Sequence, residues 1–336
     1  MPIFRRLALF TPLAALALAS CTALFEPELA QLADQPLAAE PKARGTEPWF
    51  FGQRAGKLIQ TQHFQIYTTI DDPIFQHLLI RVLEATHDRA AALTHFEPAK
   101  PLDCYVFASR AQWENHTRAR AGSNAPIYLQ ISSGGYCQEG VFAGYDIGRA
   151  QTLSVIAHEA WHQYSWFAFQ DRLPSWLEEG LATQNEALRW ESAQPVFRPE
   201  ANAGRLAALR EALRAGTLWK LSDLLSTHAG RVIKMPQPAI DAYYAQLWSL
   251  VLFLQRSPVY APRLGTLLAD AGAGRLIRAL DGTTVTPQEI ANFTEHWNTI
   301  AGPVYLQKYL NPDIAALEQE YLAWMRDFVR ANWPRT

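Results

Sequence analysis

The feature that most constrains this chain is a His-Glu-x-x-His pattern inside a run that contains neither glycine nor proline. The run covers residues 152–170, and His158, Glu159 and His162 form the pattern. Apolar residues recur through the run at helical spacing, so we predict a helix here. On a helix, positions i and i+4 lie one turn apart on the same face, so both imidazoles can reach one zinc ion. Glu159 lies between them in sequence and can accept a proton from a water molecule bound to that zinc.

A second segment with acidic residues follows after a short connection. It consists of Trp176, Leu177, Glu178, Glu179 and Gly180. Here the chain resembles the gluzincin metallopeptidases, in which a W-L-x-E-G-like segment on the helix after the zinc helix carries the third zinc ligand. In that family the ligand is the glutamate directly before the glycine, which implies Glu179 in this chain. A helix turns by about 100° per residue, so only one of the two glutamates can face the ion, and we expect Glu178 to be solvated.

The resemblance is closest to small bacterial peptidase MA-like proteins, many of them lipoproteins, and it covers residues 151–254. It implies an α+β, zincin-like metallopeptidase fold with a small N-terminal β-containing part and a mainly helical C-terminal part. It also implies a zinc-dependent peptidase that acts on a peptide or protein substrate. Three protein ligands leave a fourth position open for water, as catalytic zinc sites require. No G-A-M-E-N-like segment occurs, so aminopeptidase specificity has no support, and endo- and exo-action both stay open.

Peptide hydrolysis also needs a donor that stabilises the developing oxyanion. Aminopeptidase-like gluzincins carry a tyrosine for this role on a later helix, and the resemblance implies Tyr244, with Tyr243 as its rival. Both tyrosines also fit an alternative role as packing aromatics of a core helix. Two other functions stay open, namely a catalytically silent zincin-fold binding or assembly lipoprotein and a zinc amidase that acts on cell-wall material. The intact set of ligands and base favours the peptidase, because a silent protein need not retain all four groups.

The N-terminus has the pattern of a bacterial lipoprotein signal peptide over residues 1–20. A positive pair, Arg5 and Arg6, precedes an apolar run that is too short to span a bilayer comfortably. The run ends in Leu-Ala-Ser before Cys21, which resembles a lipobox with cleavage before Cys21 and diacylation of its sulfur. An ordinary secretory signal or an N-terminal anchor is the alternative. Thr22, rather than an aspartate, follows the cysteine, so the resemblance favours an outer-membrane lipoprotein that faces the periplasm of the bacterial cell envelope.

The two other cysteines are Cys104 and Cys137. In an exported protein they would lie in an oxidising compartment, where an even pair favours a disulfide. The alternative is two buried free thiols, because Cys104 lies in a strand-like apolar run. We predict the disulfide.

Length and charge limit the partners of this chain. It has 336 residues, 49% of them hydrophobic, and a formal net charge of −2. One or two domains can be built from this length, and near-neutral charge offers no electrostatic case for nucleic acid. The sequence implies a membrane contact through the lipid anchor and identifies no protein partner. We divide the chain into the signal peptide (1–20), a tether (21–48), an α+β part (49–150), a zinc-binding helical part (151–256) and a C-terminal helical part (257–336).

Hydrophobic periodicity predicts most of the remaining elements. We expect strands over 57–69, 102–108 and 140–145, and helices from Pro73 and over 110–120. After Glu179 the pattern is helical, over 203–215, 218–226, 241–255, 262–280, 287–301 and 314–333. In zincins an edge strand beside the zinc helix pairs with the extended substrate, and by resemblance we assign this role to residues 135–145, with an ordinary loop as the alternative.

Overall fold

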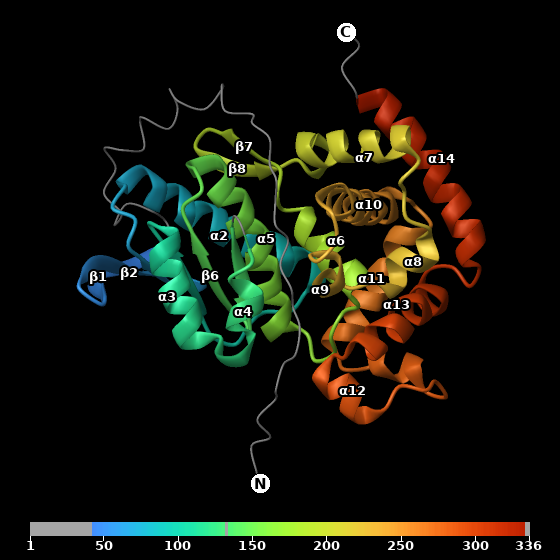
Figure 1. Cartoon of the computed structure of the whole chain (residues 1–336), viewed down its shortest axis with the longest axis horizontal. Helices are drawn as coiled ribbons and strands as arrows, with labels where there is room; N and C mark the ends of the chain where they lie inside the picture. The colour runs from blue at the N-terminus through green and yellow to red at the C-terminus, as the bar shows by residue number, and fades with distance from the viewer. Residues whose placement is uncertain (1–41, 132–133, 333–336) are drawn as a thin grey trace. The chain divides into compact units, whose positions relative to one another are not determined.

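The computed structural model describes residues 42–131 and 134–332. The signal peptide, Cys21 and most of the predicted tether lie outside these residues. The described chain is of the α+β class and divides into two units (Figure 1). We call residues 42–168 and 185–199 the sheet unit, and residues 169–184 and 200–332 the helical unit. The predicted zinc helix, placed in our sequence-based division with the residues after position 150, groups with the sheet.

The sheet unit is built on six strands in the order β1-β2-β3-β4-β6-β5. Neighbours β3, β4 and β6 are parallel, whereas β1 with β2, β2 with β3, and β5 with β6 are antiparallel. The bounds are β1 Ala43–Phe51, β2 Arg54–Thr61, β3 Phe64–Thr68, β4 Leu102–Phe107, β5 Gly135–Gln138 and β6 Val141–Tyr145. A separate hairpin of β7 (Leu188–Glu191) and β8 (Gln194–Phe197) completes the strands of this unit.

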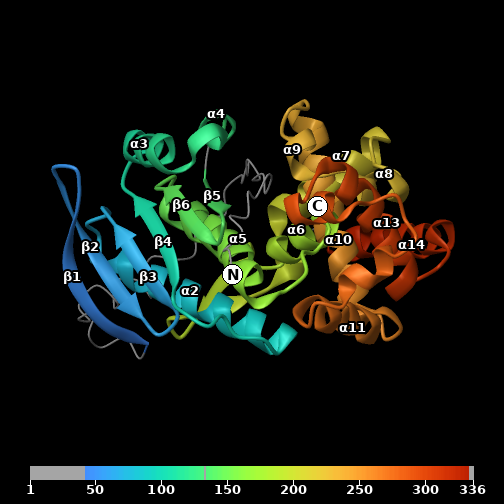
Figure 2. The same ribbon diagram turned by 90° about the horizontal axis from the view of Figure 1, so that it is seen from below.

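Helices cover both faces of the sheet, with α2 (Pro73–Thr94) and α5 (Arg149–Ala168) on one side and α3 (Arg110–Arg120) and α4 (Ala125–Tyr128) on the other (Figure 2). Successive side chains of a strand point to opposite faces of the sheet, so each strand contributes to the cores under both helix layers. Cys104 and Val106 of β4 join the core beneath α2 and α5, whereas Phe107 joins the core beneath α3. Helix α5 is therefore packed against the face of the sheet that also carries α2.

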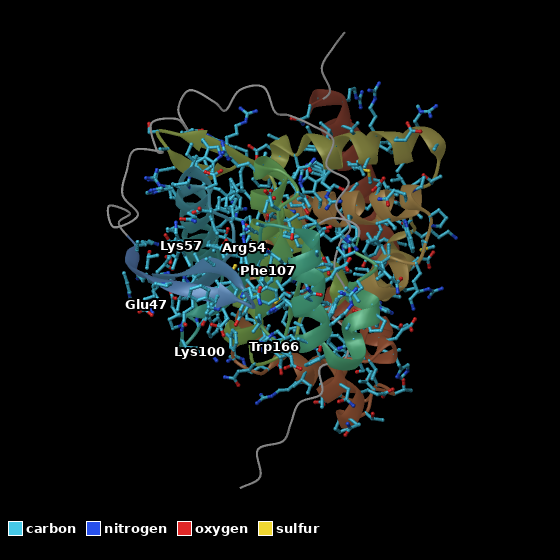
Figure 3. All side chains as sticks on the ribbon, turned by 60° about the vertical axis from the view of Figure 1, so that its left-hand side comes forward. Glu47, Arg54, Lys57, Lys100, Phe107 and Trp166 are labelled. Atoms are coloured by element: carbon cyan, nitrogen blue, oxygen red, sulfur yellow. The ribbon has the colours of Figure 1, made fainter. Side chains whose placement is uncertain are left out.

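The hairpin of β1 and β2 forms the outer end of the sheet and carries charged side chains (Figure 3). Glu47 and Arg54 are exposed, and the Lys57 ammonium lies 3.5 Å from the Asp71 carboxylate. Charged side chains on an edge strand disfavour pairing with another chain.

The helical unit is organised around α10 (Gln237–Arg256), in which every residue from Ala242 to Leu254 is buried. Helices α6, α7, α11 and α14 pack against it. The bounds are α6 Ser175–Thr183, α7 Ala203–Ala215, α8 Leu221–Ser226, α9 Ala229–Val232, α11 Tyr260–Gly272, α12 Pro287–Asn292, α13 Glu295–Tyr309 and α14 Ile314–Asn332. A helix that is apolar all round is a core helix, which is the role α10 has here.

Three differences from the sequence predictions have physical causes. The predicted strand over 57–69 is a hairpin of β2 and β3, because period-two alternation continues across its turn at residues 62–63. Residues 43–48 belong to β1 rather than to the tether, because pairing with β2 orders them. The segment 262–280 is α11 followed by a short 3-10 helix at Leu276–Leu280, and the backbone between them passes through Gly274 at φ 69°.

Candidate metal centre

Helix α5 positions both histidines of the pattern. Its residues 152–165 are all buried, and Ala157 and Ala160 give the small surfaces that allow α5 to pack closely on α2. His158 is fully buried and His162 is 5% exposed. The sequence expectation for this helix is therefore met, with its bounds shifted to Arg149–Ala168.

The two rings converge. Nε2 of His158 lies 3.3 Å from Nε2 of His162, and the ring planes are inclined at 68°. Two nitrogen ligands at about 2.0–2.1 Å from a tetrahedral zinc ion are separated by about 3.3–3.4 Å. At this distance the two nitrogens can share a hydrogen bond or, with both lone pairs exposed, bind one ion between them. The histidine pair thus fits the group that the sequence implies.

A carboxylate orients the first histidine. Nδ1 of His158 lies 3.0 Å from Oε1 of Glu186, and both side chains are fully buried. If Nδ1 donates to this carboxylate, the lone pair is on Nε2, which is the nitrogen that faces His162. The Ser154 hydroxyl donates to the backbone carbonyl of Glu186 at 2.8 Å and fixes the segment that carries it.

Sequence reasoning missed Glu186. No motif marks it, and the available signal was only an acidic residue that closely follows the Glu179 helix. It lies beyond the C-terminal end of α6, where the chain has left the helix.

Glu159 is fully buried on α5. It lies one residue after His158, so its side chain leaves the helix about 100° away from that ring. The pKa of Tyr128 is raised, first by burial and then by nearby groups that include the Glu159 carboxylate.

Glu179 is 3% exposed on α6, whereas Glu178 is half-buried. The glycine that follows Glu179 has a packing role, because a Cβ on Gly180 would lie 2.4 Å from Cγ2 of Val251 on α10. Glycine at position 180 therefore allows α6 to approach α10 closely.

The two candidate oxyanion donors on α10 are both fully buried. The Tyr243 hydroxyl donates to the Thr227 carbonyl at 3.3 Å, and burial and the Glu179 carboxylate raise the pKa of Tyr243. The Arg205 guanidinium lies over the Tyr244 ring, 5.2 Å from its centroid. Because the Tyr243 hydroxyl already has an acceptor, Tyr244 stays the preferred candidate.

The predicted disulfide is wrong. Cys104 and Cys137 are both buried, and neither forms a disulfide. Cys104 on β4 and Cys137 on β5 both pair with Phe142, so β6 lies between them. Two strand spacings separate their Cα atoms by about 10 Å, beyond the 4.4–6.8 Å that a disulfide tolerates. Compartment and an even count of cysteines favoured the bridge, but strand order excludes it.

A second histidine group lies elsewhere in the sheet unit and consists of His63, His87 and Asp88. The rings of His63 and His87 stack in parallel, with centroids 3.7 Å apart and planes inclined by 6°. The Lys42 ammonium lies 2.5 Å from Asp88 and 3.4 Å from Glu84. Parallel rings direct their lone pairs along separate planes, and a cation already neutralises the carboxylates.

Comparisons with known proteins identify no relative, since no family model, no curated protein and no solved structure matches the chain. Among the described residues, no helix has the length and apolar character needed to cross a membrane.

Proposed function

We propose that the protein is a zinc-dependent peptidase of gluzincin type with a zincin-like fold. One observation carries the proposal: Nε2 of His158 and Nε2 of His162 converge at 3.3 Å while the other nitrogen of His158 faces the Glu186 carboxylate. Glu186 supplies the oriented, neutral imidazole that zinc ligands need. A pair of surface or packing histidines would require neither feature.

His158, His162 and Glu179 would hold the ion. When bound, zinc supplies a Lewis acid that polarises the substrate carbonyl and acidifies a water molecule. Glu159 accepts the proton of the attacking water and delivers it to the leaving amine, so one carboxylate serves as base and then as acid. Tyr244 donates a hydrogen bond to the oxyanion of the tetrahedral intermediate, which lowers the barrier to its formation.

An extended peptide is the substrate that the sheet favours. Strand β5 is the edge of the six-stranded sheet next to β6, whereas β6 lies between β4 and β5. Within the predicted edge region 135–145, only β5 can therefore accept a further strand. Anchored through a lipid on Cys21, the peptidase would act on peptides or proteins of the bacterial cell envelope.

The decisive test is Glu159→Gln, which keeps the size of the side chain and removes the base. We expect turnover on a peptide that the wild type cleaves to fall by about 10²–10⁴-fold, because general-base catalysis is lost. Zinc content, measured by mass spectrometry of dialysed protein, should stay at one ion per chain. Full turnover in a zinc-loaded Glu159→Gln protein would refute the mechanism. A wild type that binds zinc and cleaves nothing in a peptide library would favour the catalytically silent alternative.

Tyr244→Phe tests the oxyanion donor. Removal of one such donor lowers kcat by about 10²–10³-fold, with little change in KM when the contact forms only in the transition state. Tyr243→Phe is the matched control, because its hydroxyl is bound to Thr227, and we expect it to keep most of the kcat. If Tyr243→Phe is the variant that loses kcat, the roles of the two tyrosines are exchanged.

A further inference from the structure

Three aromatic residues, Trp49, Phe50 and Phe51, directly precede the turn of the β1–β2 hairpin. Trp49 and Phe51 lie on the side of the sheet that carries α3, with ring centroids 6.4 and 4.8 Å from that of Phe107. Because side chains alternate along a strand, Phe50 lies on the opposite face. Its exposure there is 64%, the highest of any large hydrophobic residue in the described part of the chain.

Two apolar neighbours extend this exposed surface. Ala55 lies directly opposite Phe50 in the ladder, and Pro48 precedes Phe50 by two positions, so the three side chains share one face. Both neighbours are exposed. In the turn, a Cβ on Gly52 would have no atom within 4 Å, so the turn lies in open space. We call Pro48, Phe50 and Ala55 the hairpin patch, and the described residues leave it uncovered.

The hairpin is basic, whereas the whole chain is slightly acidic. Residues 42–61 contain four basic residues and one acidic residue, a formal charge of +3, against −2 for all 336 residues. These residues are Lys42, Arg44, Arg54, Lys57 and Glu47. Lys57 lies opposite Pro48 at the border of the patch, and Arg54 adjoins the turn (Figure 3). Arg54 is exposed and forms no ion pair with a described residue. An exposed apolar patch bordered by basic residues is complementary to an anionic surface with an apolar interior.

We propose that the tip of the β1–β2 hairpin binds an anionic phospholipid surface. Phe50 enters the boundary between headgroups and acyl chains, and Arg54 and Lys57 lie among the phosphate groups. Pro48 disfavours the alternative occupant, a second copy of the chain paired with β1, because proline has no backbone N–H to donate on an edge strand. The proposal does not depend on the proposed peptidase function.

The length of chain before β1 is compatible with this contact. Twenty residues lie between Cys21 and Lys42, and an extended chain of this length spans up to about 70 Å. Strand β1 has nine residues, so Phe51 lies about 27 Å from Ala43, where the strand begins. A lipid on Cys21 and the hairpin tip can therefore contact the same membrane. The lipid would hold the protein at the surface, and the hairpin would orient the sheet unit on it.

The test is co-sedimentation with lipid vesicles of the chain from residue 21 onward with Cys21→Ser, so that no lipid anchor contributes. We expect binding to vesicles of equal parts phosphatidylglycerol and phosphatidylcholine. Binding to phosphatidylcholine alone should be at least about tenfold weaker, because each of two basic residues near an anionic surface contributes about fivefold. Added salt should weaken the binding to the anionic vesicles. Absence of saturable binding to these vesicles, or equal binding to both kinds, would overturn the proposal.

Variants locate the contact. Phe50→Ser should weaken binding to the anionic vesicles by about tenfold, because an apolar contact is lost, and Arg54→Gln by about fivefold. Val259→Ser and Arg189→Gln are the matched controls, since each removes an exposed side chain of the same kind outside the hairpin, and both should keep the affinity. Unchanged affinity in both hairpin variants, with folding verified by circular dichroism, would refute the assignment. A concentration-dependent dimer that Phe50→Ser abolishes, without vesicle binding, would assign the hairpin patch to a second copy of the chain instead.

Discussion

The pairs His158–His162 and His63–His87 both lie in the sheet unit, and in each pair a carboxylate contacts one ring nitrogen. Glu186 lies 3.0 Å from Nδ1 of His158, and Glu84 lies 2.8 Å from Nδ1 of His63. The ring planes differ, with an inclination of 68° in the first pair and 6° in the second. Residue types alone would therefore make the two groups equally good candidates for a metal site. The inclination of their ring planes distinguishes them.

The cause of this difference is the way the chain supplies each pair. Residues one turn apart on α5 share one face, so their side chains approach a common point. His63 comes from the turn between β2 and β3, and His87 comes from α2, so these two rings meet face to face. Lys42 then supplies a positive charge to the carboxylates of the second group. A histidine cluster is metal-competent when its lone pairs converge, and only the first pair has this geometry.

The largest effect that separates the two groups is on bound zinc. We expect His162→Ala to lower the zinc content from one ion per chain to nearly none, because two remaining ligands do not hold the ion against dialysis. His87→Ala is the matched control, since it also removes a buried histidine from a helix, and it should keep the ion. Mass spectrometry of dialysed protein gives the stoichiometry. Two ions in the wild type, or loss of the ion in His87→Ala, would show that the second group binds metal and would refute the distinction between the two groups.

A smaller effect concerns the carboxylates behind the rings. Glu186→Gln should weaken zinc affinity by about 10–100-fold, because the carboxylate that orients His158 is lost. Glu84→Gln removes the equivalent contact to His63 and should leave zinc affinity unchanged. Competition with a fluorescent chelator measures both constants. Equal losses in the two variants would show that general destabilisation, and not orientation of His158, causes the effect.

Local sequence signals predicted α2 and α7 well because the ends of these helices are encoded locally, whereas the predicted helix over 287–301 is divided into α12 and α13. Pro73 opens α2, and the Asp72 side chain accepts from the backbone N–H groups of Ile74 and Phe75. Gly216 ends α7 in the left-handed conformation at φ 66°. The spacing of His158 and His162 likewise follows from helix geometry, so the approach of these two rings could be predicted from the sequence.

What the sequence did not reveal depends on pairing between distant segments. Residues 43–48 have a tether-like composition and become a strand only through β2. The separation of Cys104 and Cys137 depends on the insertion of β6 between their strands, which no count of cysteines encodes. Glu186 acts through a ring twenty-eight positions earlier in the chain, so no local motif could mark it.

The smallest predicted effect is on stability, and it belongs to the stacked pair. Burial, and then the neighbouring His63, lowers the pKa of His87 from the ordinary 6.5 to about 4. The fold therefore favours the neutral ring, and between pH 6.5 and 4 the unfolded chain binds more protons than the folded one. This contribution is complete above pH 6.5 and is lost as the pH falls toward 4, by an amount on the order of 1–2 kcal/mol.

His87→Gln cannot be protonated, so its unfolding midpoint should fall less than that of the wild type between pH 7 and pH 5. The measurement is thermal unfolding of metal-free protein at both values, which separates this effect from loss of zinc. His95→Asn is the control, because His95 is exposed at the left-handed end of α2, where asparagine is well tolerated. It should keep the wild-type pH dependence. An identical pH dependence in His87→Gln and the wild type would mean that His87 binds protons equally in the folded and unfolded chain, which would refute the lowered pKa.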